Sequence, residues 1–273
     1  MNRDSLCFEH TILFNAGLQP VSNRYLQSRI DEEVMYPFVI GQDEETGVVS
    51  LLTPFPSKEL VPKFDWISYN EPESHLDQTV DFLCRLEGIT EKSVVGGITF
   101  KDDSTLVRFA GRGFKTWKLD IQNDLDIVEK GVGVESIQRA FKTPKCQKIV
   151  EKYGTADILI VRHILEHVYD LAEFTSALKL LSSDNGYIVF ELPDCTRSLE
   201  LFDYTMLWEE HLYYFTPFTL EIILNICGFE LVRFENYDYP FENSMVAVTR
   251  VSEQQTVKIA EETLHIEILR GEQ

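Results

Sequence analysis

The sequence predicts an α/β protein with a doubly wound, mostly parallel sheet, an antiparallel edge and a small N-terminal β-rich subdomain. Short, almost continuous apolar runs such as 156–163 alternate with amphipathic segments such as 171–181. Continuous apolar strands are typical of parallel sheets that are buried on both faces. The last two predicted strands, 229–236 and 244–250, follow each other closely, which favours an antiparallel pair.

Length and composition limit the function. The chain has 273 residues, 45 acidic against 25 basic side chains and a net charge of −20. A nucleic-acid partner needs many lysines and arginines, so it is excluded, and anionic membrane surfaces are disfavoured for the same reason. The five cysteines form no C-x-x-C pair, and no run reaches about 18 apolar residues. These features predict a cytoplasmic protein without a disulfide framework.

The N-terminal segment differs in pattern from the rest of the chain. We expect residues 1–72 to form a small substrate or lid subdomain, because five prolines between positions 20 and 62 exclude long helices. A helix is expected over 74–88, with Ser74 as its N-cap and Gly88 at its end. Residues 73–252 then form the main domain, and 253–273 a polar, helical tail.

The main domain is expected to alternate strands and helices in chain order. The predicted strands are 93–98, 115–120, 132–138, 156–163 and 186–193. The predicted helices are 104–113, 123–130, 144–153, 171–181 and 216–228.

Ligands of such sheets bind beyond the carboxyl ends of the strands, and this locates candidate cofactor residues. In chain order they are Gly96, Gly97, Thr99, Asp120, Gln138 and His163, with Glu191 after the fifth strand. A glycine pair lets the backbone approach a ligand, and an acid after the second strand can accept ribose hydroxyls. Each feature alone is also an ordinary turn or strand end. Their joint position favours a nucleotide-type cofactor.

The stretch 191–216 is dense in aromatic and acidic residues and contains one histidine. Its candidates for substrate contact or proton transfer are Trp208, Glu209, Glu210, His211, Tyr213 and Tyr214. Aromatic walls, carboxylates and a potential base suit a small-molecule site. A loop that covers the core has the same composition, so both readings stay open here.

Residues 163–167 match the pattern H-x-x-E-H of some zinc proteases. Such a site needs both histidines on one face of a continuous helix, whereas His163 is expected to end a strand. Arg162 beside it would repel a cation. We therefore expect no metal and interpret Glu166 and His167 as residues that shape the cleft.

Three segments, 140–194, 208–232 and 240–245, resemble the class I S-adenosylmethionine-dependent methyltransferases, and most of all the sugar C-methyltransferases of deoxysugar biosynthesis. That family has a Tyr-His-Glu-His stretch followed by Tyr-Phe-Ser, where this chain reads 208-WEEH-211 and 214-YFT-216. The resemblance implies a Rossmann-like seven-stranded sheet and S-adenosylmethionine as cofactor. It also implies His211 as general base, Glu210 as its neighbour, and substrate contacts from Glu191, Trp208, Glu209, Tyr213, Tyr214 and Asn243.

Departures from the family pattern leave a second hypothesis open. The zinc cysteines of the family are missing, its C-terminal domain is expected to be absent, and its glycine-rich loop keeps only Gly96 and Gly97. The altered glycine loop favours a binding or regulatory protein that retains the fold without catalysis. The implied substrate is a small polar molecule, phosphorylated or nucleotide-linked, for C- or O-methylation. Its candidate cationic contacts are Lys101, Arg108, Arg162 and Arg197. A monomer or homodimer is expected.

Overall fold

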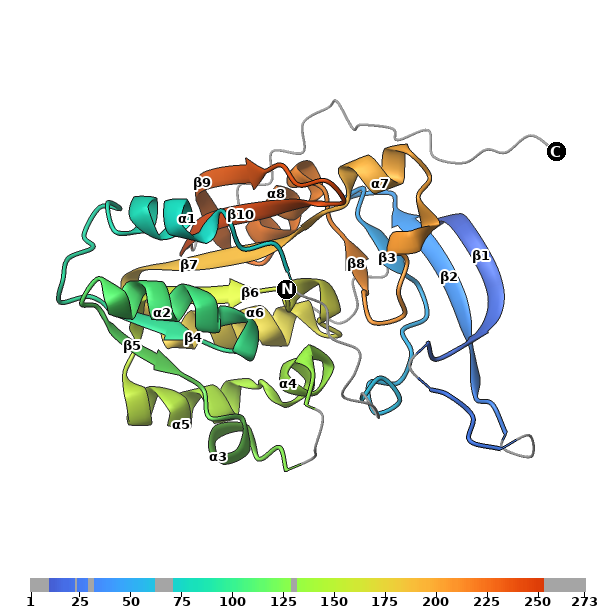
Figure 1. Ribbon diagram of the computed structural model, residues 1–273, viewed down its shortest axis with the longest axis horizontal. Helices are drawn as coiled ribbons and strands as arrows, with labels where there is room; N and C mark the ends of the chain where they lie inside the picture. Colours follow the sequence, from blue (N-terminus) through green and yellow to red (C-terminus); the bar gives the residue numbers. More distant parts are fainter. Residues whose placement is uncertain (1–9, 23, 29–31, 62–70, 129–131, 253–273) are drawn as a thin grey trace.

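The computed structural model describes residues 10–22, 24–28, 32–61, 71–128 and 132–252. It contains a six-stranded mixed sheet flanked by helices and a four-stranded antiparallel sheet at one side (Figure 1). The predicted helical tail at 253–273 lies outside the described residues. None of the helices that can be described is both long and apolar enough to cross a membrane.

The six-stranded sheet has the order β5-β4-β6-β7-β10-β9. Its members are β4 (Val94–Gly97), β5 (Lys115–Lys118), β6 (Ala156–Arg162), β7 (Ser182–Asp194), β9 (Phe229–Tyr237) and β10 (Asn243–Val251). The first four strands in this order pair in parallel, and β10 pairs antiparallel with both β7 and β9. The predicted α/β class, the parallel core and the antiparallel edge are confirmed.

Helices cover both faces of this sheet, as the alternation in β6 illustrates. Ile158 and Ile160 belong to one apolar cluster with α1 (Leu76–Leu83) and α2 (Asp103–Gly111). Leu159 and Val161 belong to the other, which contains α4 (Val134–Ala140), α5 (Thr143–Tyr153), α6 (Leu171–Leu181) and α8 (Pro217–Ile226). Successive strand side chains point to opposite faces, so β6 is buried on both sides. The remaining short helices are α3 (Ile121–Leu125), α7 (Thr196–Glu200), η1 (Phe100–Asp102), η2 (Leu165–His167) and η3 (Tyr204–Met206).

The strand predicted at 132–138 is wrong, because this segment forms the helix α4. Val134 and Ile137 are its buried apolar residues, Phe141 is the buried residue at its C-cap, and their spacing of three and four fits a helix. Gly133 is the N-cap. The main sheet therefore has six strands among the described residues rather than seven.

Helix boundaries also differ from their predictions. The helix predicted at 123–130 is α3, which already ends at Leu125. The N-cap of α1 is His75 rather than Ser74, whose hydroxyl lies 2.8 Å from the Tyr239 hydroxyl. That helix ends at Leu83, before the turn at Gly88. The bond between Ser74 and Tyr239 instead connects the start of α1 to the loop between β9 and β10.

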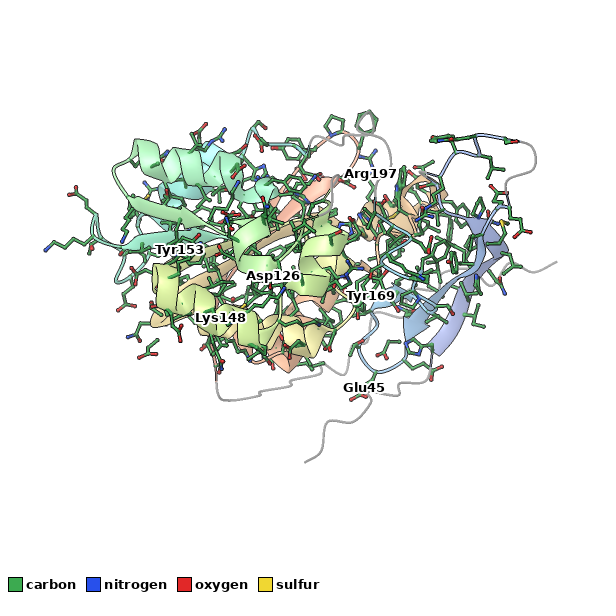
Figure 2. All side chains as sticks on the ribbon, turned by 90° about the horizontal axis from the view of Figure 1, so that it is seen from below. Glu45, Asp126, Lys148, Tyr153, Tyr169 and Arg197 are labelled. Carbon is green, nitrogen blue, oxygen red and sulfur yellow. The ribbon has the colours of Figure 1, made fainter. Side chains whose placement is uncertain are left out.

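The smaller sheet has the order β1-β2-β3-β8. Its first three strands, β1 (His10–Pro20), β2 (Met35–Asp43) and β3 (Val49–Leu51), come from the N-terminal segment. The fourth, β8 (Tyr213–Tyr214), comes from the stretch that carries His211. Figure 2 shows Tyr169 near the boundary between the two parts, and its hydroxyl donates to the carbonyl of Phe55. The N-terminal β-rich unit is thus completed by residues of the predicted main domain.

Candidate functional site

The carboxyl ends of the parallel strands meet at one edge of the main sheet. Gly97 of β4 is in register with Ile160 of β6, and Arg162 is in register with Glu191 of β7. The loops after β4, β6 and β7 therefore converge, as expected for a ligand site of this fold.

The loop after β4 is closed by one of its own side chains. The buried carboxylate of Asp102 accepts from the backbone N–H groups of Ile98 (2.7 Å), Thr99 (2.8 Å) and Arg162 (2.9 Å). Burial raises the pKa of Asp102 to about 6, although these N–H groups and the Arg162 charge act in the opposite direction. The amides of Ile98 and Thr99 thus have a partner within the protein.

Gly96 and Gly97, at the end of β4, leave space that side chains of neighbouring elements fill. A Cβ atom on Gly96 would lie 2.5 Å from the ring of Trp117, and one on Gly97 would lie 2.7 Å from Leu106. Thr99 is the buried N-cap of η1. The glycine pair therefore serves close packing of β4 against its neighbours.

Asp120 and Gln138 have different surroundings. Asp120 is exposed after β5, where its carboxylate accepts from the N–H groups of Gln122 and Asn123 at 3.1 Å and caps α3. Gln138 is buried on α4, where its amide donates to the Glu135 carbonyl and accepts from the Tyr169 N–H group. A ribose could therefore reach the Asp120 carboxylate, whereas the buried amide of Gln138 is bonded within the protein.

Three buried side chains, Arg162, His163 and His75, surround the buried carboxylate of Glu191. We call these four residues the Glu191 cluster. Arg162 binds Glu191 with two N–H groups, at 2.7 and 2.9 Å. The Nε2 atoms of His75 and His163 lie 3.1 and 3.4 Å from Oε1 of Glu191. Glu191 was expected to contact substrate, but its oxygens face these side chains.

His163 lies in the left-handed backbone region, with φ of 48°. This conformation follows the end of β6, and the His163 N–H group donates to the Glu191 carbonyl at 2.8 Å. Burial disfavours the charged ring, but Glu166, Glu191 and Glu71 around it raise the pKa of His163 to about 10. His163 is therefore an imidazolium that links two groups of carboxylates.

A second group, the Glu166 cluster, consists of Glu166, His167 and His211. One ligand atom from each of these residues lies within 4.8 Å of the other two. The rings of His167 and His211 meet edge to face, with 4.7 Å between centroids. Glu166 and His167 are buried, and His211 is half-buried. A molecule at the surface can therefore reach the cluster through His211.

The histidines of the Glu166 cluster are held uncharged. Burial lowers the pKa of His167 to about 3 and also lowers the pKa of His211. Burial opposes the charge on Glu166 as well, but the neighbouring His163 holds the pKa of that carboxyl to about 2. A neutral imidazole beside a carboxylate can accept a proton near neutral pH.

Further carboxyl groups surround this cluster. Glu135 lies 3.4 Å from Nδ1 of His167, and Lys101 forms an ion pair of 2.5 Å with Glu71. Burial, with mutual repulsion between neighbouring acids, raises the pKa of Glu135 and of Glu210. Glu135 and Glu210 therefore hold their protons more readily than ordinary glutamates, whereas Glu166 keeps its negative charge.

The remaining predicted substrate residues lie around the loop before β8. Glu209 is buried and accepts from the N–H and hydroxyl groups of Ser22 at 2.6 and 2.7 Å. The buried Tyr214 hydroxyl donates to the Trp208 carbonyl at 3.0 Å, whereas the Trp208 side chain is exposed. Tyr213 stacks on Phe215. The Glu209 contact attaches the loop to the segment that follows β1, and the other contacts lie within the stretch 208–215.

Asn243, the other predicted substrate residue, begins β10 and accepts from the N–H group of Tyr239. The four predicted cations also have partners within the protein. Arg108 pairs with Asp77, and Arg197 donates to the Pro240 carbonyl at 2.9 Å. Lys101 and Arg162 pair with glutamates as described above.

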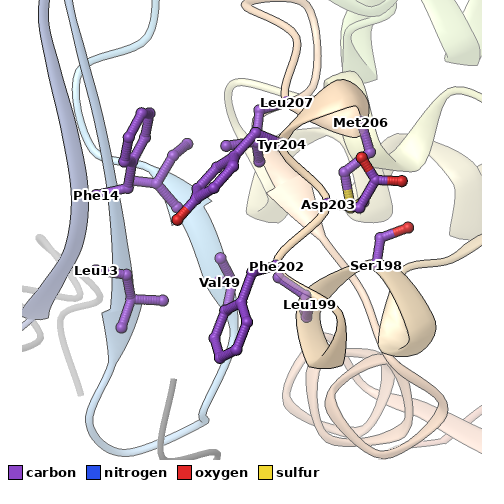
Figure 3. A pocket seen from close by; sticks show the side chains of 11 residues that line it. Leu13, Phe14, Val49, Ser198, Leu199, Phe202, Asp203, Tyr204, Met206 and Leu207 are labelled. Carbon is purple, nitrogen blue, oxygen red and sulfur yellow. The ribbon is translucent and has the colours of Figure 1, made fainter. Parts of the chain in front are cut away.

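An apolar cavity of about 30 Å³ lies between the small sheet and α7 (Figure 3). Leu13, Phe14, Leu199 and Tyr204 are among its lining residues. With room for only a few water molecules, it cannot hold a sugar-sized substrate.

Three site residues were missed by sequence reasoning. Glu135 was placed in a strand that is a helix, and helical spacing of its apolar neighbours was the available signal. His75 and Glu71 precede α1, far in sequence from the residues they contact. No local motif indicates those contacts.

Residues 101–233 match a family model described as a methyltransferase domain. The C-methyltransferase NovU of Streptomyces niveus is 23% identical over 164 residues, which cover 60% of this chain and 39% of that protein. Among solved structures, the 1,6-didemethyltoxoflavin-N1-methyltransferase of Burkholderia thailandensis has a TM-score of 0.45, with 13% identity over 66% of this chain and 80% of that one. Magnesium protoporphyrin IX methyltransferase of Synechocystis PCC 6803 has a TM-score of 0.43, with 19% identity over 65% and 82%.

Proposed function

We propose that this chain, which belongs to the class I S-adenosylmethionine-dependent methyltransferases, transfers the methyl group of its donor to a small polar substrate. The observation that carries the proposal is the match of residues 101–233 to a methyltransferase domain. The parallel strand ends of the sheet and the partly accessible His211 lie within or beside that match. The 164-residue alignment with the curated relative covers 39% of that protein, so activity and substrate are our inference.

The residues present fit the donor in part. The exposed carboxylate of Asp120 suits the ribose hydroxyls, and the charged carboxylate of Glu166 suits a sulfonium cation near His211. The amides of Ile98 and Thr99 bind Asp102 instead. When bound, the donor supplies an electrophilic methyl group.

His211 is the proposed proton acceptor, because its ring is neutral, half-buried and next to Glu166. With a keto substrate, its ring nitrogen takes the proton from the carbon beside the carbonyl. The enolate carbon would then accept the methyl group as the methyl–sulfur bond breaks and S-adenosylhomocysteine leaves. With an alcohol, it takes the hydroxyl proton. Glu210 lies beside it as an orienting or substrate-binding group. The C-methyltransferase named among the relatives favours the keto case.

The proposed substrate is a nucleotide-linked sugar or a related precursor of a surface glycan or natural product. Its polar part would contact the loop that contains Trp208 and Tyr213. Because Arg162 and Lys101 pair with glutamates, a phosphate group is expected to bind away from the Glu166 cluster. We propose a cytoplasmic monomer or homodimer.

Calorimetry with S-adenosylmethionine and S-adenosylhomocysteine tests the proposal, followed by turnover on a panel of keto sugars and alcohols. Asp120→Ala should weaken donor binding, and turnover should recover in part at high donor concentration. Failure of the unmodified protein to bind either compound would refute the proposal.

The closure of the β4 loop by Asp102 favours a second candidate, a binding or regulatory protein without catalysis. Donor binding without turnover across the panel would select this candidate.

A further inference from the structure

We propose that Glu166, His167 and His211 form a binding site for a divalent transition-metal ion of the zinc type. The three residues offer one carboxylate and two imidazoles, with ligand atoms within 4.8 Å of one another. Two histidines and one carboxylate are a recurrent zinc ligand set, in which water takes the fourth position. The ion requires a small inward movement of the side chains, and His211 is half-buried in a loop that can supply it.

An unpartnered oxygen is the second observation. Oε2 of Glu166 is buried and has no hydrogen-bond partner among the described residues. The other oxygen, Oε1, lies 3.7 Å from Nδ1 of His163. A buried carboxylate oxygen without a partner is costly, and a metal ion would satisfy it.

The orientation of His167 is the third observation. Its Nδ1 atom lies 2.8 Å from the carbonyl oxygen of Glu210, so Nδ1 carries the proton and donates. The lone pair then remains on Nε2. Metal-binding histidines commonly have this arrangement, in which the other ring nitrogen donates to a backbone carbonyl. Glu135 lies 3.4 Å from the same ring, on its Nδ1 side.

The site differs from the zinc-protease pattern that residues 163–167 suggest. His163 belongs to the Glu191 cluster, because its Nε2 atom faces Glu191 at 3.4 Å. The site instead combines Glu166 and His167 of that pattern with His211, which lies 44 positions after His167 in the sequence. The sequence alone led us to expect no metal, since it does not reveal this long-range contact.

The ion and the proposed proton transfer exclude each other. A neutral imidazole has one lone pair, and an ion bound to His211 occupies the pair that would accept the substrate proton. Zinc should therefore inhibit methyl transfer. This consequence rests on the proposed function, whereas binding of the ion does not.

Calorimetric titration of the metal-free full chain with zinc chloride tests the site. We expect one ion per chain. Glu166→Gln and His167→Asn should each weaken binding by at least about 100-fold, because even an outer partner of a metal ligand is typically worth 10–100-fold. His10→Asn is the matched control, since His10 lies on β1 beside Asp43 in the small sheet, and should bind as the unmodified chain does.

Cobalt(II) provides a second readout. At this site it should give visible ligand-field bands without the near-ultraviolet charge-transfer band of a thiolate ligand. A thiolate band, absence of zinc binding by the unmodified chain, or full binding by both Glu166→Gln and His167→Asn would overturn the proposal. Circular dichroism checks that each variant folds. If both buried variants fail to fold, His211→Asn decides: retained affinity overturns the site, and loss supports it.

Inhibition of turnover is measured separately. A chain that binds zinc but shows no turnover at all refutes the proposed function and leaves the metal site supported.

Discussion

Glu191 and Glu166 lie on opposite sides of the His163 ring, and their surroundings differ. Both oxygens of Glu191 bind Arg162, and two histidines approach Oε1. Glu166 has one oxygen near His163 and one without a partner. The comparison teaches that burial and charge alone do not identify a functional acid. Glu191, whose oxygens are both hydrogen-bonded, supports the fold, whereas Glu166 has an unpartnered oxygen that is available to a ligand.

The largest expected effect separates chemistry from stability. His211→Ala should reduce turnover by roughly 10²–10⁴, the typical worth of a positioned base. The unfolding midpoint and donor affinity should stay almost unchanged, because the half-buried ring contributes little to the core. Steady-state kinetics and calorimetry check this. Turnover close to that of the unmodified enzyme would remove His211 from its proposed role, and loss of folding would make it a structural residue.

The Glu191 cluster should respond in the opposite sense. Arg162→Met leaves Glu191 buried without its guanidinium and should lower the free energy of unfolding by about 3–5 kcal/mol. Urea unfolding measures the change. Arg233→Met removes an exposed ion pair with Glu235 and serves as control, with an expected cost of about 1 kcal/mol or less. Equal costs in the two variants would contradict the structural role of the Glu191 cluster.

Asp102 adds a pH dependence at the neighbouring strand end. Its pKa is raised to about 6 in the folded protein, so the folded state keeps this proton while the unfolded state loses it near pH 4. The free energy of unfolding therefore falls as the pH rises from about 4 to about 6, by up to about 3 kcal/mol for a difference of two pKa units. Asp102→Asn should remove this part of the slope. Urea unfolding at several pH values measures it, and an unchanged slope would refute the assignment.

The smallest expected effect concerns the position of the Glu166 cluster. Ser22→Ala removes the hydroxyl that donates to Glu209 and should lower the free energy of unfolding by roughly 1.5–3 kcal/mol. The N–H bond of Ser22 to the same carboxylate remains. Because the bond tethers the loop before His211, KM should rise more than kcat falls. Thr205→Ala, which changes an exposed bond to Asp203, is the control and should alter neither constant.

The fold was largely predictable because its signal is local. The runs 156–163 and 186–193 have almost continuously apolar centres, as is typical of strands buried on both faces, and both form strands of the central sheet. The segment 132–138 was wrongly predicted as a strand because it is short and its apolar residues show both the two-residue spacing of a strand and the three-residue spacing of a helix. Val134 and Ile137 became informative only with Phe141, outside the predicted strand.

The site was less predictable because its contacts span the chain. The stretch that contains His211 was recognised from composition and resemblance. The packing of β8 on the N-terminal sheet brings Glu209 to Ser22, which is 187 positions away. The same packing places His211 against His167. The glycine pair lies at a strand end, as predicted. Its close packing against Trp117 and Leu106 could not be predicted, because these residues belong to neighbouring elements.

The two-residue strand β8 has a consequence for protein engineering. The Leu212 N–H group donates to the Glu166 carbonyl, and the Leu212 carbonyl accepts from Leu51 of β3. The N-terminal sheet and the His211 loop therefore form one discontinuous module, although Leu51 and His211 are 160 positions apart in the sequence. A chimaera that exchanges only residues 10–61 with a relative would leave β8 facing a foreign strand. Transfer of substrate preference between relatives should require residues 10–61 and 204–216 to be grafted together.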